Sequence, residues 1–187
     1  MIARRVALLV AVVGAVAALA PFVAGANHLD VEDPNDVDGR LDVKRVETGG
    51  TDRPRWKVVT YSTWQVKRIR DKGYFLVYLD TFGDEWFDYY ALVRSDGRHL
   101  RASLWRDRRV KADKYVSELD EYRKGERSVV VRVPLAKVKL PDTRLFYRWY
   151  VQTLFIGKSC QNVCFDRAPD GEPMVEPNPA VTPTPTE

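Results

Sequence analysis

The chain has few of the side chains on which hydrolases and metalloenzymes commonly depend. Its 187 residues include two histidines, His28 and His99, which lie far apart in the sequence. Neither a His-Glu-x-x-His nor a Gly-x-Ser-x-Gly motif occurs, and no phosphate-binding glycine loop does. Paired carboxylates such as Asp80 and Asp84 suffice for glycoside hydrolysis, but a chain with 26 acidic residues contains such pairs by chance. The sequence therefore predicts a protein without catalytic activity, with a glycoside hydrolase as the less favoured alternative.

Strong positive charge is also missing. The net charge is +4, and Arg4 and Arg5 supply two of these charges in a segment of 26 residues without Asp or Glu, so a chain starting at Asn27 carries +2. Proteins that bind nucleic acids usually have a strongly basic domain, and no such partner is expected here. Basic residues do gather at 106–111, where we expect a solvated loop, the alternative being contact with an acidic cell-wall polymer or a lipid surface.

A long hydrophobic run occurs once, at the N-terminus. Two arginines precede the apolar run Val6–Ala20, and Ala24-Gly25-Ala26 provides the small residues of a cleavage site. We expect residues 1–26 to be a signal peptide removed after this site, which predicts a secreted, extracellular protein. The alternative is a retained anchor at the cell surface, because the uncharged segment reaches the roughly 20 residues that span a bilayer. Contact with a membrane is expected through this segment alone.

Cysteine is scarce as well. Cys160 and Cys164 are the two in the chain, and neither follows the N-terminal run closely, which excludes lipid attachment there. In an exported protein, two cysteines separated by three residues predict a disulfide bond. So small a loop removes little chain entropy, and the bond is expected to pin the segment after the last strand. A redox-active pair is less favoured, because the two-residue spacing of such motifs is missing.

The sequence between the two ends is rich in short alternating runs. Tyr74–Thr81 combines β-branched and aromatic residues between two glycines, which is typical of a central, buried strand. Asp96-Gly97 favours a hairpin turn. Residues 107–127 fit either a helix or an edge strand at Lys114–Leu119, and we favour a short strand with a turn. Further strands are expected at residues 41–46, 56–63, 89–93, 98–106, 128–134 and 145–156.

Seven or more strands with short turns predict an all-β fold. We expect residues 27–167 to form one antiparallel, jelly-roll-like β-sandwich. Pro134 should end the strand at 128–134, at an edge of the sheet, because proline cannot donate a ladder hydrogen bond. Residues 168–187 are rich in Pro and Thr and lack the apolar side chains that offset ordering entropy, so a disordered tail is expected.

Acidic residues alternate in one short stretch. Asp36, Asp38 and Asp42 flank Gly39, and a tight loop of this kind lets several carboxylates point at one hard cation such as Ca²⁺. The stretch does not match an EF-hand, so further oxygens have to come from elsewhere, such as Asp166 or a backbone carbonyl. The stretch is therefore a candidate structural calcium site, and a solvated acidic turn leading into a strand is the favoured interpretation.

Aromatic and polar side chains are expected on the outward faces of two strands. If Leu104 faces the core, its neighbour Trp105 faces outward. An exposed ring can cover the apolar face of a sugar while polar neighbours hydrogen-bond the hydroxyls. For any one of these rings taken singly, a place in the core is the favoured interpretation. The predicted carbohydrate-binding residues are Trp105, Arg101, Tyr150, Arg148 and Gln152, with Trp64 and Tyr78 as further candidates.

Four short segments carry a resemblance to known proteins: residues 33–36 (DPND), 39–43 (GRLDV), 147–150 (YRWY) and 164–169 (CFDRAP). Over residues 33–169 the chain resembles small secreted actinobacterial β-sandwich proteins of uncharacterised function. More remotely it resembles DOMON and family 9 carbohydrate-binding sandwiches. The resemblance implies a jelly-roll-like sandwich that binds a ligand, often a sugar, sometimes with a structural calcium. Haem is not expected, because no Met/His pair suited to axial ligation is identified.

Taken together, these patterns predict an exported, non-catalytic module that binds carbohydrate or a cell-envelope polymer, with a candidate structural calcium site. The alternative is a secreted structural or protein-interaction domain, which would bind through a strand edge or an apolar patch.

Overall fold

The computed structural model describes residues 28–50, 53–69, 73–84, 86–140, 143–156, 163–178 and 181. Over these residues the protein is all-β, as predicted, with antiparallel strands and two short helical turns. The predicted signal segment, Cys160 and residues 182–187 lie outside the described part of the chain. Among the residues described, no helix has the length and apolar character needed to cross a membrane.

The strands follow the alternating runs of the sequence. The strand expected at Tyr74–Thr81 is confirmed, and it pairs with a neighbour on each side. Two short turns, α1 (Val66–Ile69) and the 3₁₀ turn η1 (Leu135–Lys137), lie between strands. The strands are β1 (Asp30–Glu32), β2 (Val43–Gly49), β3 (Arg55–Thr60), β4 (Gly73–Asp80), β5 (Tyr89–Ser95), β6 (Leu100–Arg106), β7 (Lys114–Arg123), β8 (Ser128–Arg132), β9 (Phe146–Phe155), β10 (Cys164–Ala168) and β11 (Met174–Pro177).

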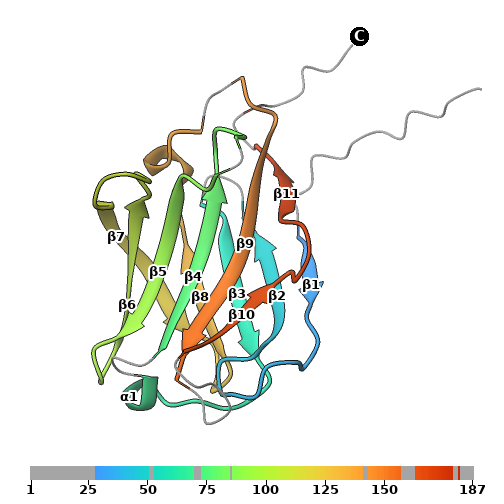
Figure 1. Cartoon of the computed structure of the whole chain (residues 1–187), viewed down its shortest axis with the longest axis vertical. Coiled ribbons are helices and arrows are strands. Elements are labelled where there is room, and N and C mark those ends of the chain that lie inside the picture. Colours follow the sequence, from blue (N-terminus) through green and yellow to red (C-terminus); the bar gives the residue numbers. More distant parts are fainter. Residues whose placement is uncertain are drawn as a thin grey trace, which may run out of the picture.

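All of these strands belong to one sheet. Its order is β1-β2-β3-β8-β7-β6-β5-β4-β9-β10, and β11 pairs with β9 beyond β10. Because β7 pairs with β6 on one side and with β8 on the other, the sheet continues through β7 and curls into a half-barrel. In Figure 1, β6, β5, β4 and β9 form the near layer, and β8, β3 and β2 form the far layer.

The core fills the space between the two layers. Trp56 of β3 meets Trp149 of β9 edge to face, with ring centroids 6.2 Å apart. Burying large apolar side chains in this way contributes about 1.5–3 kcal/mol for each. The inward faces predicted for β6 and β8 are confirmed, since Leu100, Ala102, Leu104, Val129, Val131 and Val133 are all buried.

Two predictions about sheet edges are wrong. Residues 107–127 contain a strand, as favoured, but β7 lies between β6 and β8. The polar sequence of β7 is typical of an edge strand. The structure explains this polarity differently: the sheet bends at β7, few of its side chains reach the core, and Leu119 is its one buried residue. Likewise β8 lies between β3 and β7. It ends at Arg132, so Pro134 falls outside the ladder and precedes η1.

The predicted disordered tail starts too early. Ala168 ends β10, and Met174–Pro177 forms β11 against the edge of β9. Glu176 is buried in β11, where it accepts hydrogen bonds from the Tyr147 hydroxyl (2.6 Å) and the Trp149 indole N–H (3.0 Å). The segment is ordered by specific polar contacts to the core, which its Pro-rich composition does not indicate.

Candidate functional site

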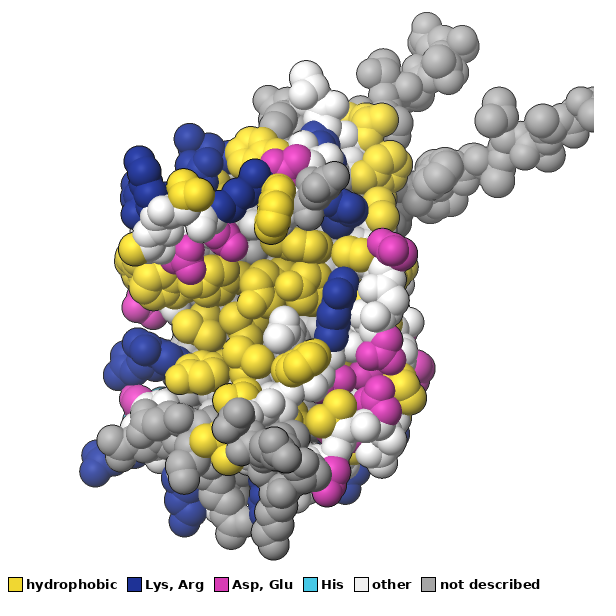
Figure 2. Space-filling view, in the orientation of Figure 1, with side chains coloured by type: hydrophobic (Ala, Val, Ile, Leu, Met, Phe, Trp, Pro, Cys, Tyr) yellow, Lys and Arg dark blue, Asp and Glu magenta, His cyan; other side chains and the backbone are white. Residues whose placement is uncertain are grey.

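Five aromatic side chains form one row across the four strands of the near layer and the adjoining β7. Tyr150 of β9 pairs with Tyr78 of β4, Tyr78 with Tyr90 of β5, Tyr90 with Trp105 of β6, and Trp105 with Tyr115 of β7. On β4, β5, β6 and β9 the preceding residue is buried in the core, so the alternation of the strand points these rings outward. We call these five residues the aromatic row. Figure 2 shows the broad hydrophobic surface over these strands.

A β-bulge brings the last member into the row. Leu104 pairs with Ser117, whereas the next residue, Trp105, pairs with Tyr115, so β7 contributes one extra residue, Val116, at this point. Bulges re-aim side chains in this way. As a result, Tyr115 meets Trp105 edge to face with ring centroids 5.6 Å apart.

The rings of the row support one another. Tyr78 and Tyr150 are stacked with centroids 4.6 Å apart, and the centroids of Tyr78 and Tyr90 lie 5.8 Å apart. Tyr90 and Trp105 are parallel at 6.4 Å. At the β10 end, the Arg167 guanidinium lies over the Tyr150 ring, 4.2 Å from its centroid. Rings held by ring contacts lose little conformational freedom when a ligand binds, which reduces the entropic cost of binding.

The tyrosine hydroxyls of the row remain protonated at neutral pH. Burial, followed by the neighbouring Tyr78, raises the pKa of Tyr150 to about 12. Burial and a hydrogen bond to Asp113 raise the pKa of Tyr90, and burial raises that of Tyr78. Each phenol therefore keeps its proton beside its apolar ring; the Tyr90 hydroxyl donates its proton to Asp113 and can still accept a hydrogen bond.

The loop between β4 and β5 forms one border of the row. The Asp88 carboxylate accepts hydrogen bonds from the Thr81 N–H (2.8 Å) and the Phe82 N–H (3.1 Å), which hold the loop against the sheet. Phe87 of this loop meets both Tyr150 (4.7 Å) and Tyr78 (6.2 Å) edge to face. In Figure 2, charged side chains lie along the upper border of the hydrophobic surface.

Three of the five predicted carbohydrate-binding residues, Trp105, Tyr150 and Gln152, lie together. Trp105 and Tyr150 are members of the row, and Tyr78, a further candidate, joins them. Gln152 lies on the same face of β9, where it pairs with Leu76 of β4 and Arg167 of β10. The sequence alone missed the other members of the row, because cross-strand register is not visible along one strand.

The remaining candidates have other contacts. Arg148 lies at the border of the row and binds the buried Asp80 carboxylate at 2.6 Å. Arg101 is four positions from Trp105, roughly 13 Å along the strand, and pairs with Asp96 at 3.1 Å, so it lies outside the row. Trp64 is a core residue, 1% exposed, with its ring between Phe75 (5.4 Å) and the Arg123 guanidinium (3.8 Å).

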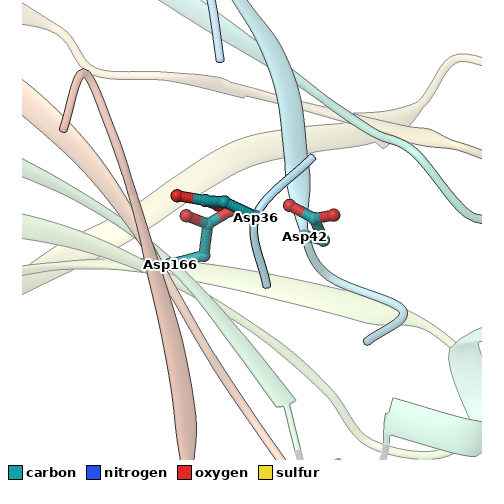
Figure 3. Close-up of side chains that lie close together, drawn as sticks. All are labelled: Asp36, Asp42 and Asp166. Carbon is teal, nitrogen blue, oxygen red and sulfur yellow. The ribbon is translucent and has the colours of Figure 1, made fainter. Parts of the chain in front are cut away.

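A second cluster, of carboxylates, lies at the open side of the half-barrel. Asp36 and Asp42 come from the segment before β2, and Asp166 comes from β10. Each offers an oxygen within 4.8 Å of those of the other two, and Figure 3 shows the three side chains converging. The Val43 N–H donates to Asp166 Oδ2 at 2.5 Å, so this carboxylate also bridges β2 and β10. We call Asp36, Asp42 and Asp166 the acidic cluster.

The cluster is an unfavourable place for negative charge. Burial, followed by repulsion from Asp166, raises the pKa of Asp42 to about 7. The same two causes raise the pKa of the neighbouring Asp33 to about 8. Among the described residues, no Lys or Arg forms an ion pair with Asp33 or with any member of the cluster.

The cluster matches the predicted metal-ligand set in part. Asp36 and Asp42 are brought together, and Asp166 joins them as the sequence suggested. Asp38 is exposed and does not belong to the cluster. Asp33 was missed, because only the packing of the loop against β10 places it beside Asp166. Carboxylate oxygens alone suit a hard cation such as Ca²⁺.

Cys164 is buried at the start of β10, while its predicted partner Cys160 lies outside the described residues, so the disulfide stays a prediction.

No family model, curated protein or solved structure matches this chain. The resemblance to actinobacterial, DOMON and family 9 carbohydrate-binding sandwiches therefore also stays a prediction, and the geometry of the two clusters is what bears on function.

Proposed function

We propose that this protein is an exported, non-catalytic binding module whose aromatic row binds a carbohydrate chain, either a glycan or a cell-envelope polymer. The proposal includes export by residues 1–26, by cleavage or by retention at the cell surface. We also propose that the curled sheet is a jelly-roll-like β-sandwich. The single observation that carries the proposal is the row of five outward rings on five adjacent strands.

The chemistry of the row suits a sugar. Its rings offer apolar surface to the C–H faces of a pyranose, and four of the five carry a hydroxyl that can bond a sugar hydroxyl. Gln152 and Ser103 lie on the same face one step along their strands, and add further polar groups. Because the row crosses the strands, we expect an extended chain of sugar units to lie across the sheet rather than along it.

The row can be tested with two substitutions and one matched control. In the purified protein, Trp105→Ala and Tyr150→Ala should each weaken retention on isolated cell walls and on a glycan array about tenfold, which corresponds to ~1.4 kcal/mol. Tyr122→Ala removes a ring that is 37% exposed and lies outside the row, so it should leave retention unchanged. Thermal unfolding of each variant checks that it folds.

Two results would argue against this function. Folded wild-type protein that shows no retention on either support removes the proposal. Equal losses for Tyr122→Ala and Trp105→Ala indicate non-specific adhesion of exposed aromatic groups rather than a built site.

The protein-interaction alternative has its own observation. Leu92 faces outward beside the row and is half-buried, whereas its neighbour Leu76 is buried, and apolar area such as that of Leu92 also suits a protein partner. Concentration-dependent self-association that Trp105→Ala abolishes, without any retention on glycans, would favour this alternative.

A glycoside hydrolase is less well supported by the candidate pair Asp80 and Asp84. Arg148 binds Asp80, and Arg109 binds Asp84 at 2.6 Å. The hydrogen bond from Arg109 lowers the pKa of Asp84, whereas a general acid needs a raised pKa.

A further inference from the structure

We propose that Asp36, Asp42 and Asp166 bind one calcium ion, which fastens β10 to the start of β2 across the open side of the half-barrel. This inference goes beyond the proposed function and does not depend on it, because the acidic cluster and the aromatic row are separate groups of residues.

The first support is the geometry of the three carboxylates. They come from two segments far apart in the sequence, yet their oxygens lie within 4.8 Å of one another. Ca²⁺ binds oxygens at about 2.3–2.6 Å, so two ligands of one ion lie up to about 5 Å apart. Asp36, Asp42 and Asp166 can therefore reach a single ion placed between them, in the arrangement that Figure 3 shows.

The second support is independent and concerns unpaired buried oxygens. Asp42 is 1% exposed, and its Oδ1 has no hydrogen-bond partner within the described part of the chain. Asp33, which borders the cluster, is 4% exposed, and none of the described residues gives its Oδ2 a hydrogen-bond partner either. A buried carboxylate oxygen without a donor is costly, and an ion is one of the few groups that can satisfy it. A cation at the cluster gives Asp42 Oδ1 a partner and offsets the repulsion among the four carboxylates.

The donor set selects the kind of ion. All three candidate ligands are carboxylates, and the described residues place no His or Cys in the cluster, so zinc and copper are disfavoured. Asp36 is exposed, which leaves room for water molecules to complete the six to eight ligands that Ca²⁺ accepts. Mg²⁺ demands a near-ideal octahedron and retains its water more strongly, so it fits an irregular, half-buried site less well.

The position of the ion indicates that it would link β10 to the start of β2. Among the described strands, no ladder joins β10 to β2. The two strands are linked by the hydrogen bond from the Val43 N–H to the Asp166 carboxylate. Nearby, the Thr153 hydroxyl donates to the Leu41 carbonyl at 2.8 Å. An ion held by both segments adds strong bonds where backbone pairing is missing. It also fixes Arg167, the neighbour of Asp166, whose guanidinium covers the Tyr150 ring.

The experiment compares two neighbouring aspartates. The full chain is stripped with a chelator and titrated with CaCl₂ in a calorimeter, with thermal unfolding measured on the same samples. The wild type should bind one equivalent of calcium and unfold at a higher temperature when saturated. Asp36→Asn should weaken calcium binding at least tenfold, whereas Asp38→Asn, an exposed residue of the same loop outside the cluster, should stay within about threefold of wild type.

Asp36 is the first choice because its side chain is exposed, so its substitution should not prevent folding. Asp166→Asn is the second variant, checked by circular dichroism, since Asp166 also accepts the Val43 hydrogen bond. Hydrogen exchange locates the effect: calcium should slow the exchange of amides in 164–168 in the wild type, but not in Asp36→Asn.

Three outcomes would overturn the proposal. Folded wild-type protein that shows neither binding heat nor a shift in unfolding temperature has no calcium site. Equal weakening in Asp36→Asn and Asp38→Asn points to general screening of an acidic loop. An equal response to MgCl₂ at the same concentration rules out the assignment to calcium. None of these readouts involves a glycan, so they are distinguishable from failure of the proposed function.

Discussion

Glu176 shows how a single side chain can tie a terminal segment to the core. Its carboxylate accepts hydrogen bonds from Tyr147 and Trp149, two buried residues of β9. Burial, followed by the charge of Glu176, raises the pKa of Tyr147, so the phenol remains a donor. The order of β11 therefore depends on one acidic residue in a Pro-rich segment.

Replacing Glu176 with Ala should lower the free energy of unfolding by about 2–4 kcal/mol, because two buried donors lose their acceptor. Chemical denaturation measures the change. Glu172→Ala is the control, since Glu172 is an exposed acid of the same segment, and its effect should stay within about 0.5 kcal/mol. Similar losses in the two variants would contradict the role given to Glu176.

The β5–β6 hairpin is the element that the sequence specifies most directly. Gly97 has φ of +97°, a region that side chains with a Cβ avoid, and the Asp96 carboxylate accepts hydrogen bonds from the N–H groups of Arg98 and His99 at 2.8 Å. The turn sets the register that places Tyr90 opposite Trp105, so the geometry of the aromatic row depends on it.

Gly97→Ala should destabilise the protein by about 1–2 kcal/mol, because alanine is strained at this φ. Gly171→Ala is the matched control, since no atom of the described residues lies within 4 Å of the Cβ it would add and its φ is not in the strained region. Urea unfolding compares the two. A neutral result for Gly97→Ala would show that the turn adapts without cost.

The distribution of charge over the whole molecule predicts how stability depends on pH. Hydrogen bonds from the backbone N–H groups of His99 and Arg98 lower the pKa of Asp96, and a hydrogen bond from Arg109 lowers that of Asp84. Such groups stabilise the fold above their ordinary pKa of 3.8, and this stability is lost as the pH falls. Asp33 and Asp42 have the opposite effect on the pH dependence of stability, because their pKa values are raised in the folded protein.

In metal-free buffer, the free energy of unfolding should therefore fall as the pH rises from 5 to 8. Over this range the folded protein binds more protons than the unfolded chain, since the pKa of Asp33 is about 8 and that of Asp42 about 7, against 3.8 when unfolded. Denaturant titrations with a chelator present measure the slope. Asp33→Asn should flatten it, and a slope that is unchanged in this variant would place its origin elsewhere.

The sequence by itself determined the all-β class, most strand positions, the inward faces of β6 and β8, and the Asp-Gly turn. These follow from period-two alternation and from backbone preferences, which act between residues close together in the chain. It also indicated Trp105, Tyr150, Asp36 and Asp42 as candidates, because their residue types limit the chemistry they can perform.

Only the tertiary structure decided which candidates meet. Curling of the sheet makes β7 and β8 internal strands, and cross-strand register assembles the aromatic row from five separate segments. Packing of β10 beside β2 brings Asp166 to Asp42 and leaves Asp38 outside the acidic cluster. Arg101 pairs with Asp96 and lies outside the aromatic row. Such contacts depend on how distant segments close around a shared core, and no pattern within one segment contains that information.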